Sequence, residues 1–359
     1  MKVFSKTKLI DKKQIKSIIK ERKLMSKLSH PFLVNMHFSF QDNHHLFMIL
    51  DLMKGGDLRY YYKLQNQKFS EIECKFMISN LILGLEYIHA NYIIHCDIKP
   101  ENIVISEDGY FYLSDFGIAR DLKEEEKNKN SIEGSLGYMA PEIIFQKNVT
   151  LAVDYFCLGV VAYEMMMGSL PYFGKNLEDI KKLILATQVK IRKFSIPEGW
   201  SVNSADFINK LIQRKYIKRL GNNNIDEIKN HPWLSDIDWK KLYLHQLISP
   251  FQPDTDRTMF NNSFITKRKE IEDSQVTLER YKDIEINRNY SSIFDEFYYL
   301  NKFSMKYRKE GEYFINPHLK YINNSININN ENINVNMKKK NSDEKGNNKS
   351  IICNIKVKY

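Results

Sequence analysis

The chain has 359 residues, of which 43% are hydrophobic and 27% charged, and its formal net charge is +10. This composition is typical of a folded globular protein, and it excludes a wholly disordered, collagen-like or membrane-embedded chain. Four cysteines lie far apart without a C-x-x-C pair, which argues against a disulfide framework or a structural zinc site and favours a reducing compartment. We expect a cytoplasmic location, with the nucleus as the alternative, because the chain has no secretory signal and no apolar run that could span a bilayer.

Residues 1–28 carry ten Lys or Arg against two acidic residues, and their apolar side chains recur at helical spacing. This pattern predicts a basic amphipathic helix that ends before Pro31, because the residue preceding a proline is disfavoured in a helix. Strand-like runs follow at 32–38 and 46–50, with a turn at 41–43 between them. Together these segments predict a small strand-rich part with one helix.

The character of the sequence changes at Ser70. Ser70 and Glu73 have the spacing of a capping box, which predicts that a long helix starts here. Short strands are expected on either side of residues 97–102, and further helices over 154–167 and 204–217. A strand-rich part followed by a larger helical part predicts an α+β fold.

Beyond residue 239 the periodicity weakens and an extended tail is expected, and from about residue 303 the chain is rich in Asn and Lys. That last segment holds eleven Lys or Arg and five Asp or Glu, so it supplies +6 of the net charge. It buries too little apolar area to offset the entropy of ordering, so we expect it to be disordered. Because the excess charge lies on this tail, and no zinc-finger or RNA-binding motif occurs, nucleic acid is not an expected partner.

Three short motifs carry the chemistry. Residues 95–102 read HCDIKPEN, residues 115–117 read DFG and residues 140–142 read APE. In this order and at these separations they resemble the signature of the eukaryotic protein kinases, which is H-R-D-x-K-x-x-N, then D-F-G, then A-P-E. A single Asp in such a loop is most often a turn-forming residue, but four polar residues in register indicate the family.

The resemblance implies a two-lobed protein-kinase fold and transfer of the γ-phosphate of ATP to Ser or Thr hydroxyls of protein substrates. Asp97 would accept or orient the proton of the substrate hydroxyl, and Lys99, which matches the Ser/Thr kinase pattern, would lie against the transferring phosphate. Asn102 and Asp115 offer the hard oxygen ligands that Mg²⁺ or Mn²⁺ prefers.

The resemblance also implies nucleotide contacts. Lys2 falls where the family places the lysine on the ATP phosphates, and Glu21 falls where it places the acidic partner of that lysine. The other implied nucleotide-binding positions are Asp51, Met53, Asp57, Glu101 and Val104. Glu142 and Arg219 match a buried ion pair of the family, and Asp154 matches a position that anchors the catalytic loop to a helix.

Substrate preference is implied by three acidic positions. Asp57, Glu101 and Glu164 match residues that, in basophilic kinases of the AGC group, contact arginines just before the phosphoacceptor. They predict a preference for basic protein substrates, although Asp57 could instead bind only the ATP ribose. Ser135 falls where a hydroxyl contacts the catalytic loop beside the substrate, and Ser131 falls at the phosphorylation site of the activation loop.

Within the AGC group the sequence is most similar to the YANK branch (serine/threonine kinase 32), because residues 30–35, 39–42 and 55–60 are near-identical to that branch. The similarity extends to about residue 264. The expected domains are a kinase N-lobe at 1–52, a C-lobe at 53–234, an AGC-type C-terminal tail at 235–302, and the Asn/Lys-rich segment at 303–359.

The start of the chain departs from the family. No strands precede Lys2, and the first glycine is Gly55, so the N-lobe is expected to be incomplete, with the first two strands and the Gly-rich loop absent. Either the start is an internal methionine of a longer protein, or the kinase is impaired. The chain as given is expected to bind ATP weakly.

Two further departures concern regulation. Cys96 replaces the arginine that pairs with an activation-loop phosphate, so phosphorylation of Ser131 is expected to matter less here. Residues 294–299 read FDEFYY and resemble the AGC hydrophobic motif F-x-x-F-[ST]-[FY], with Tyr298 at the Ser/Thr position. Whether this motif docks on the helix that bears Glu21 stays open at this point.

Two functions from different classes fit the sequence. The first is a monomeric Ser/Thr protein kinase that depends on ATP and Mg²⁺ and acts on basic protein substrates. The second is a pseudokinase or scaffold with weak or no ATP binding, because the Gly-rich loop is missing. The full set of catalytic side chains favours the first, since a scaffold has no chemical need for all of them. A small-molecule phosphotransferase fits less well, because residues 140–142 suit a platform for protein substrates.

Overall fold

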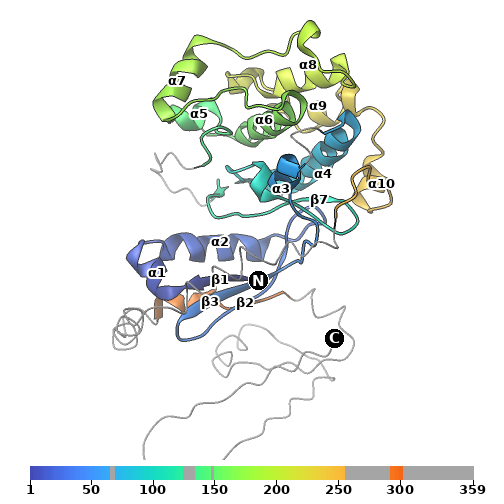
Figure 1. Cartoon of the computed structure of the whole chain (residues 1–359). Helices are drawn as coiled ribbons and strands as arrows, with labels where there is room; N and C mark the ends of the chain where they lie inside the picture. The colour runs from blue at the N-terminus through green and yellow to red at the C-terminus, as the bar shows by residue number, and fades with distance from the viewer. Residues whose placement is uncertain (65–68, 124–133, 147–148, 255–291, 302–359) are drawn as a thin grey trace, which may run out of the picture. The chain divides into compact units, whose positions relative to one another are not determined.

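The computed structural model describes residues 1–64, 69–123, 134–146, 149–254 and 292–301 (Figure 1). The chain divides by its internal contacts into residues 1–300 and 301–359, and the helices and strands below belong to the first unit. The Asn/Lys-rich segment expected at 303–359 lies outside the described residues. In the described ranges, no helix is both long and apolar enough to cross a membrane.

The N-terminal part is built on an antiparallel sheet with the strand order β1-β3-β2-β9. β1 (Lys2–Ser5) pairs with β3 (His45–Leu50), and β3 pairs with β2 (Met36–Gln41). Two helices, α1 (Lys6–Asp11) and α2 (Ile15–Lys27), lie along this sheet (Figure 1). The sheet therefore positions Lys2, on β1, under the helix that bears Glu21.

The basic amphipathic helix predicted within residues 1–28 is confirmed as α2, and the strand β1 and the short helix α1 precede it. Ser5 ends β1 and caps α1, where its hydroxyl accepts the N–H of Lys8 at 3.4 Å. Lys13 separates α1 from α2 with a backbone φ of 55°, which a right-handed helix cannot contain. Helical periodicity is a local signal, whereas β1 exists because residues 45–48 pair with it.

The strand predicted over 32–38 begins only at Met36. Phe32 and Leu33 are buried in a turn after Pro31, and this turn is bonded to the helical part of the molecule. The N–H of Val34 donates to the carbonyl of Leu113 at 2.9 Å, and the N–H of Leu113 donates to Phe32 at 3.1 Å. These apolar residues link the two parts of the fold instead of extending β2.

The capping box predicted at Ser70 is confirmed. The Ser70 hydroxyl accepts the N–H of Glu73 at 3.3 Å, and the Ser70 N–H donates to the Glu73 carboxylate at 2.8 Å. The buried helix α4 (Glu71–Ala90) follows and packs against α6 (Ala152–Met167), the helix predicted over 154–167.

The helix predicted over 204–217 is shorter than expected. Helix α8 (Val202–Leu211) ends six residues early. The side chain of Gln188 binds the main chain just beyond α8, because it donates to the Ile212 carbonyl at 3.0 Å and accepts the Arg214 N–H at 2.9 Å.

The tail expected beyond residue 239 begins with one helix that was not predicted. The remaining helices of this part are α3 (Leu58–Leu64), α5 (Pro141–Ile144), α7 (Leu177–Ala186), α9 (Asp226–Lys229) and α10 (Trp239–Tyr243).

Two small sheets position the loop that carries the catalytic motif. β6 (Ile103–Ile105) pairs with β4 (Gly56–Asp57) and β7 (Phe111–Leu113), and β5 (Ile93–Ile94) pairs with β8 (Arg120–Asp121). Strands thus flank residues 97–102 as predicted. The α+β kinase fold inferred from the sequence agrees with this arrangement of helices and small sheets.

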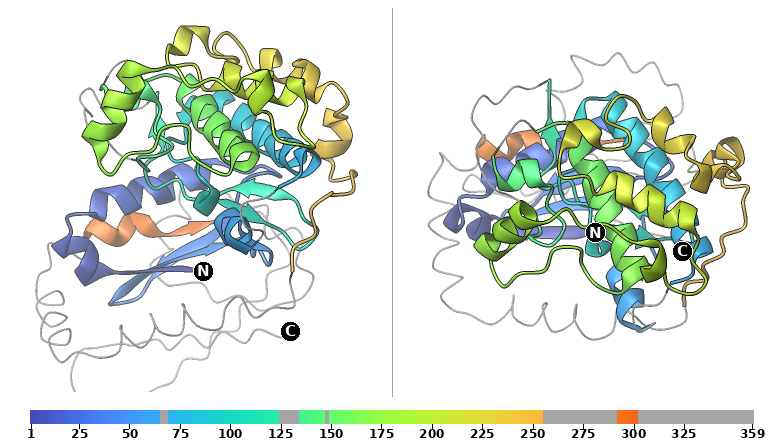
Figure 2. Two further views of the ribbon diagram at one scale, coloured as in Figure 1. Left: turned by 45° about the horizontal axis from the view of Figure 1, so that its top comes forward. Right: turned by 90° about the horizontal axis from the view of Figure 1, so that it is seen from above.

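The FDEFYY motif docks on the N-terminal part, which resolves the question that the sequence left open. Phe294 and Phe297 are 1% and 0% exposed, and the segment packs against α2 and β2 (Figure 2). The Ser39 hydroxyl donates to the Phe297 carbonyl, and Lys23 of α2 forms an ion pair with Glu296. The short strand β9 (Tyr299–Leu300) then pairs with β2.

Candidate active site

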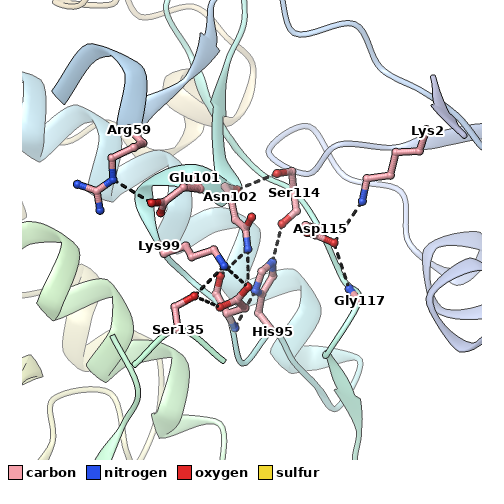
Figure 3. Close-up of polar contacts among 11 residues, drawn as sticks. Lys2, Arg59, His95, Lys99, Glu101, Asn102, Ser114, Asp115, Gly117 and Ser135 are labelled. Carbon is pink, nitrogen blue, oxygen red and sulfur yellow. Dashed lines mark hydrogen bonds and ion pairs between the residues drawn. The ribbon is translucent and has the colours of Figure 1, made fainter. Parts of the chain in front are cut away.

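The carboxylate of Asp97 lies in the loop between β5 and β6 and accepts hydrogen bonds from three side chains (Figure 3). Lys99 Nζ donates to Oδ2 at 2.7 Å, and Asn102 Nδ2 donates to the same oxygen at 2.9 Å. Ser135 Oγ donates to Oδ1 at 3.1 Å, and Lys99 Nζ donates to Ser135 Oγ at 2.7 Å. The side chains that the sequence singled out therefore meet around one carboxylate with a cation beside it.

The loop is held from below by Asp154, at the start of α6. This buried carboxylate accepts the backbone N–H groups of His95 at 2.8 Å and Cys96 at 2.9 Å, and it contacts His89 Nε2 at 2.8 Å. Cys96 has a φ of 67°, an uncommon backbone conformation for a residue with a side chain. The hydrogen bonds to Asp154 stabilise this conformation and so fix the direction in which Asp97 points.

Cys96 takes no part in charge pairing. Its side chain is 6% exposed, and burial raises the pKa of the thiol well above its usual value, so the thiol is neutral at physiological pH. It cannot pair with a phosphate as an arginine does. Ser131, the predicted phosphorylation site, lies outside the described residues.

Asn102 and Asp115 are the two residues that were predicted to bind a metal ion. Both amide N–H bonds of Asn102 point to Asp97, with distances of 2.9 Å to its backbone oxygen and to Oδ2. The side-chain oxygen of Asn102 is therefore the group left for a ligand. Ser114 joins the two segments, since its N–H and its hydroxyl donate to the Asn102 carbonyl at 2.9 and 3.0 Å.

These residues fit Mg²⁺ by their donor chemistry. The described residues contain no cluster of three or more His, Cys, Asp or Glu side chains that could enclose a metal by themselves. One carboxylate and one amide oxygen suit a cation that keeps several waters and is bound together with substrate phosphates, as Mg²⁺ commonly is. The protein half of such a site is what Asn102 and Asp115 provide.

Lys2 connects three elements at this site. Its Nζ lies 3.0 Å from Glu21 Oε1 on α2 and 3.2 Å from Asp115 Oδ1. Burial acts to lower the pKa of Lys2, but the two carboxylates outweigh it and raise the pKa. Burial likewise acts to raise the pKa of Asp115, yet Lys2 and the N–H of Gly117 lower it overall. At neutral pH the site therefore holds a charged lysine and a charged Asp115, while burial raises the pKa of Glu21 against the pull of Lys2.

The remaining predicted nucleotide positions lie around the connection between the two parts of the fold. Asp51 and Met53 lie just after β3, and Asp57 on β4 is the cross-strand partner of Val104 on β6. The Asp51 carboxylate accepts the N–H groups of Asn35 at 2.8 and 2.9 Å, so it faces the sheet. Because the carboxylate is bonded to Asn35, Asp51 would contact a nucleotide only through its main-chain atoms.

The predicted substrate carboxylates are not all open. Glu101 and Glu164 both bind Arg59, at 3.0 Å from Nε and 2.9 Å from Nη1. Asp57 accepts the N–H of Tyr60 at 3.0 Å, at the start of α3. No local pattern indicated the role of Arg59, because an arginine near the start of a short helix is usually solvated. Only the tertiary structure brings it to the two glutamates.

Glu142 and Arg219 form the buried ion pair that the resemblance implied. Nη1 lies 2.6 Å from Oε1 and Nη2 lies 3.1 Å from Oε2, and the side chains are 3% and 0% exposed. The pair connects α5 to the turn before α9.

The fold and the Asp97 site define a protein kinase domain, and sequence comparison agrees. Residues 1–234 match the protein kinase domain family, and the chain belongs to that family. The chain is 37% identical over 256 residues to a probable serine/threonine-protein kinase of Dictyostelium discoideum, covering 71% of this chain and 55% of that protein. It is 35% identical over 274 residues to ribosomal protein S6 kinase 2 alpha of Gallus gallus, covering 75% and 35%. Ribosomal protein S6 kinase alpha-3 of Homo sapiens matches at 35% over 260 residues, covering 72% and 34%.

The matched part of this chain thus spans between a third and somewhat over half the length of these relatives. The kinase family and the likeness to S6 kinases confirm the resemblance inferred from the motifs. The YANK branch and the incomplete N-lobe stay predictions.

Proposed function

We propose that this chain is a serine/threonine protein kinase that transfers the γ-phosphate of ATP to hydroxyls of protein substrates. The observation that carries the proposal is the Asp97 carboxylate, which Lys99, Asn102 and Ser135 hold in one orientation at 2.7 to 3.1 Å. The printed names of the relatives, serine/threonine-protein kinase and S6 kinase, support the choice of hydroxyl.

Each side chain of the site has a distinct task. Asp97 orients the attacking hydroxyl and takes up its proton. The Ser135 hydroxyl, 3.1 Å from Asp97 Oδ1, occupies a position on that carboxylate that a substrate hydroxyl can share. Lys99 stays 2.7 Å from the same carboxylate and places a positive charge beside the reacting oxygens. Lys2 presents a cation to the nucleotide phosphates while Glu21 holds it in place.

The divalent ion, Mg²⁺ or Mn²⁺, would neutralise phosphate charge when it is bound, and Asn102 and Asp115 are the residues that would hold it.

A preference for basic substrates is part of the proposal, and the Glu101 carboxylate, whose side chain is 47% exposed, supports it. So is membership in the YANK branch, which rests on residues 55–60 and the other matching segments. We further propose that the kinase acts as a monomer in the cytoplasm.

The test is phosphate transfer from radiolabelled ATP, with Mg²⁺, to a mixture of basic and neutral Ser peptides. The full chain should label the peptides, and Asp97→Asn should reduce the rate about 10²- to 10⁴-fold, because the proton acceptor is lost. A matched control is Asp236→Asn, whose carboxylate pairs with Lys75 on the surface and should leave the rate unchanged. Binding of ATP and peptide without any transfer would contradict the proposal and favour the pseudokinase.

A further inference from the structure

The guanidinium of Arg59 is bound on every side by groups of the chain itself. Nε donates to Glu101 Oε1 at 3.0 Å, and Nη1 donates to Glu164 Oε1 at 2.9 Å. Nη2 donates to the hydroxyl of Tyr138 and lies 3.5 Å from Glu164 Oε2. Both glutamates were predicted to contact arginines of a substrate, and both contact an internal arginine instead.

This arrangement is packed and largely sheltered from water. The side chain of Glu164 is 7% exposed and that of Arg59 is 20% exposed. The guanidinium carbon lies 5.2 Å from the ring centre of Tyr62 and 6.0 Å from that of Tyr138. The Tyr62 hydroxyl donates to the backbone carbonyl of Glu164 at 2.8 Å, and this hydrogen bond holds the Tyr62 ring against α6. A guanidinium close to aromatic rings, with a forked contact to a carboxylate, is an arrangement that arginine favours.

The Glu164 carboxylate has no free oxygen in this arrangement. Oε1 accepts from Arg59 Nη1, and Oε2 accepts from the Tyr138 hydroxyl and faces Nη2. Burial acts to lower the pKa of Arg59, but Glu164, Tyr138 and Glu101 outweigh it and raise the pKa, so the arginine is charged at any physiological pH. A substrate guanidinium would have to displace Arg59 and would meet its positive charge.

Glu101 and Asp57 differ from Glu164 in this respect. The Glu101 side chain is 47% exposed and shares only one oxygen with Arg59, and Asp57 uses one oxygen to accept the Tyr60 N–H. Exposed carboxylates can exchange partners with solvent and substrate at little cost, whereas breaking a buried pair leaves an uncompensated charge. The acidic surface is thus divided into an open part and an occupied part.

We propose that Arg59 is a specificity-determining residue, which occupies Glu164 in place of a substrate arginine. Substrate recognition then depends on Glu101 and Asp57, and the substrate class is protein segments with one or two basic residues near the phosphoacceptor, not segments with a larger cluster of arginines. This inference rests on the proposed kinase function and deepens it. Removal of Arg59 frees Glu164 as a third acidic side chain for recognition, and the kinase then also selects arginine at one more position of the substrate.

The experiment uses a set of peptides with one Ser acceptor and a single Arg placed in turn at each of the six preceding positions. Transfer rates on the full chain are compared with an all-Ala peptide. A parallel set with Ala at the acceptor and a fluorescent label reports binding by anisotropy, independently of transfer. The wild type should prefer Arg at the positions read by Glu101 and Asp57. Arg59→Met should add one new position, with a gain of about tenfold, the size expected when a charged group gains a hydrogen-bonded partner.

Matched variants separate specificity from structure. Arg59→Met combined with Glu164→Gln should lose the new preference, because the opened carboxylate is gone. Arg192→Met, a change at an arginine beside the exposed Phe194 ring, should leave the positional profile unchanged. In the wild-type background, Glu164→Gln should leave the profile as it is, whereas Glu101→Gln should reduce the preference for Arg at one position. This last pair keeps the test valid if Arg59→Met does not fold, which thermal melting shows.

An unchanged profile in folded Arg59→Met, or the loss of one Arg preference in Glu164→Gln, would overturn the inference. If no variant transfers phosphate, but the binding profiles shift as described, the proposed kinase function fails and the assignment of Arg59 stands. If transfer occurs and the profiles do not shift, the function stands and the assignment fails.

Discussion

Two sets of ion pairs near the Asp97 loop, Arg219 with Glu142 and Lys2 with Glu21 and Asp115, lie at different depths. Arg219 and Glu142 are sealed, with side chains 0% and 3% exposed, and Arg219 also donates to the carbonyls of Ala152 and Gln213. Lys2 is 33% exposed and Asp115 is 46% exposed. The hydrogen-bonding groups of the buried pair all bind other groups of the protein, so this pair stabilises the fold and has no group left for a ligand. Lys2 and Asp115, in contrast, form an open group whose cation and carboxylate lie at the surface, where a ligand can reach them.

The largest expected effect is on the sealed pair. Glu142→Gln leaves the buried Arg219 guanidinium without its counter-charge and should lower the free energy of unfolding by about 3–5 kcal/mol. Urea denaturation measures this loss. Glu178→Gln, which breaks an exposed pair with Lys181, is the control and should leave the midpoint unchanged. Equal midpoints for the two variants would show that burial does not distinguish these ion pairs.

A smaller loss of stability is expected from changes in the docked motif at residues 294–299, which packs against α2, the helix that bears Glu21. Phe297→Ala should cost about 2 kcal/mol, less than the 3–5 kcal/mol of a deep Phe→Ala change, because this segment can detach without global unfolding. Hydrogen exchange should rise in α2 and β2 but not in α4. Phe194→Ala, at a side chain that is 81% exposed, should change neither region. Unaltered exchange in α2 would mean that the motif does not support Glu21.

The smallest effect on stability is expected at Lys2 itself. Lys2→Met should cost about 1 kcal/mol at pH 7, because Lys2 and Asp115 are partly solvated and the buried Glu21 can take up a proton once its cation is removed. Lys2 lowers the pKa of Asp115, so this contribution is present above the unfolded pKa of about 3.9 and is lost as the pH falls through the folded value. Lys2 also opposes the raised pKa of Glu21, which adds to the same trend. The difference in stability between wild type and variant should therefore narrow from pH 6 to pH 3.

Urea denaturation across that pH range measures how the free energy of unfolding changes in the wild type and the variant. The rate of phosphate transfer at pH 7 should fall by a much larger factor than the small loss of stability would explain. Lys54→Met removes a lysine from an exposed pair with Glu107 and serves as the control for loss of one positive charge. A stability gap that stays constant with pH would mean that Lys2 does not hold the charge of Asp115.

Local patterns gave the parts of the molecule that depend on near neighbours. The capping box at Ser70 is encoded within four residues, and the contacts of Asp97 with Lys99 and Asn102 lie within one kinase motif. The periodicity of the sequence predicted α2 but not β1 or α1, because β1 depends on pairing with β3. Arg59 was missed for the same reason, since Glu101 and Glu164 are 42 and 105 residues away in sequence.

The strand β9 has a consequence for how the protein behaves at high concentration. β2 would otherwise be the last strand of its sheet, with unpaired N–H and C=O groups at residues 38–39. Such an open border is a template for pairing between molecules, and natural proteins usually cover it. Here the chain covers it with its own residues 294–300. Shortening the protein to the catalytic lobes alone would uncover this border and favour self-association.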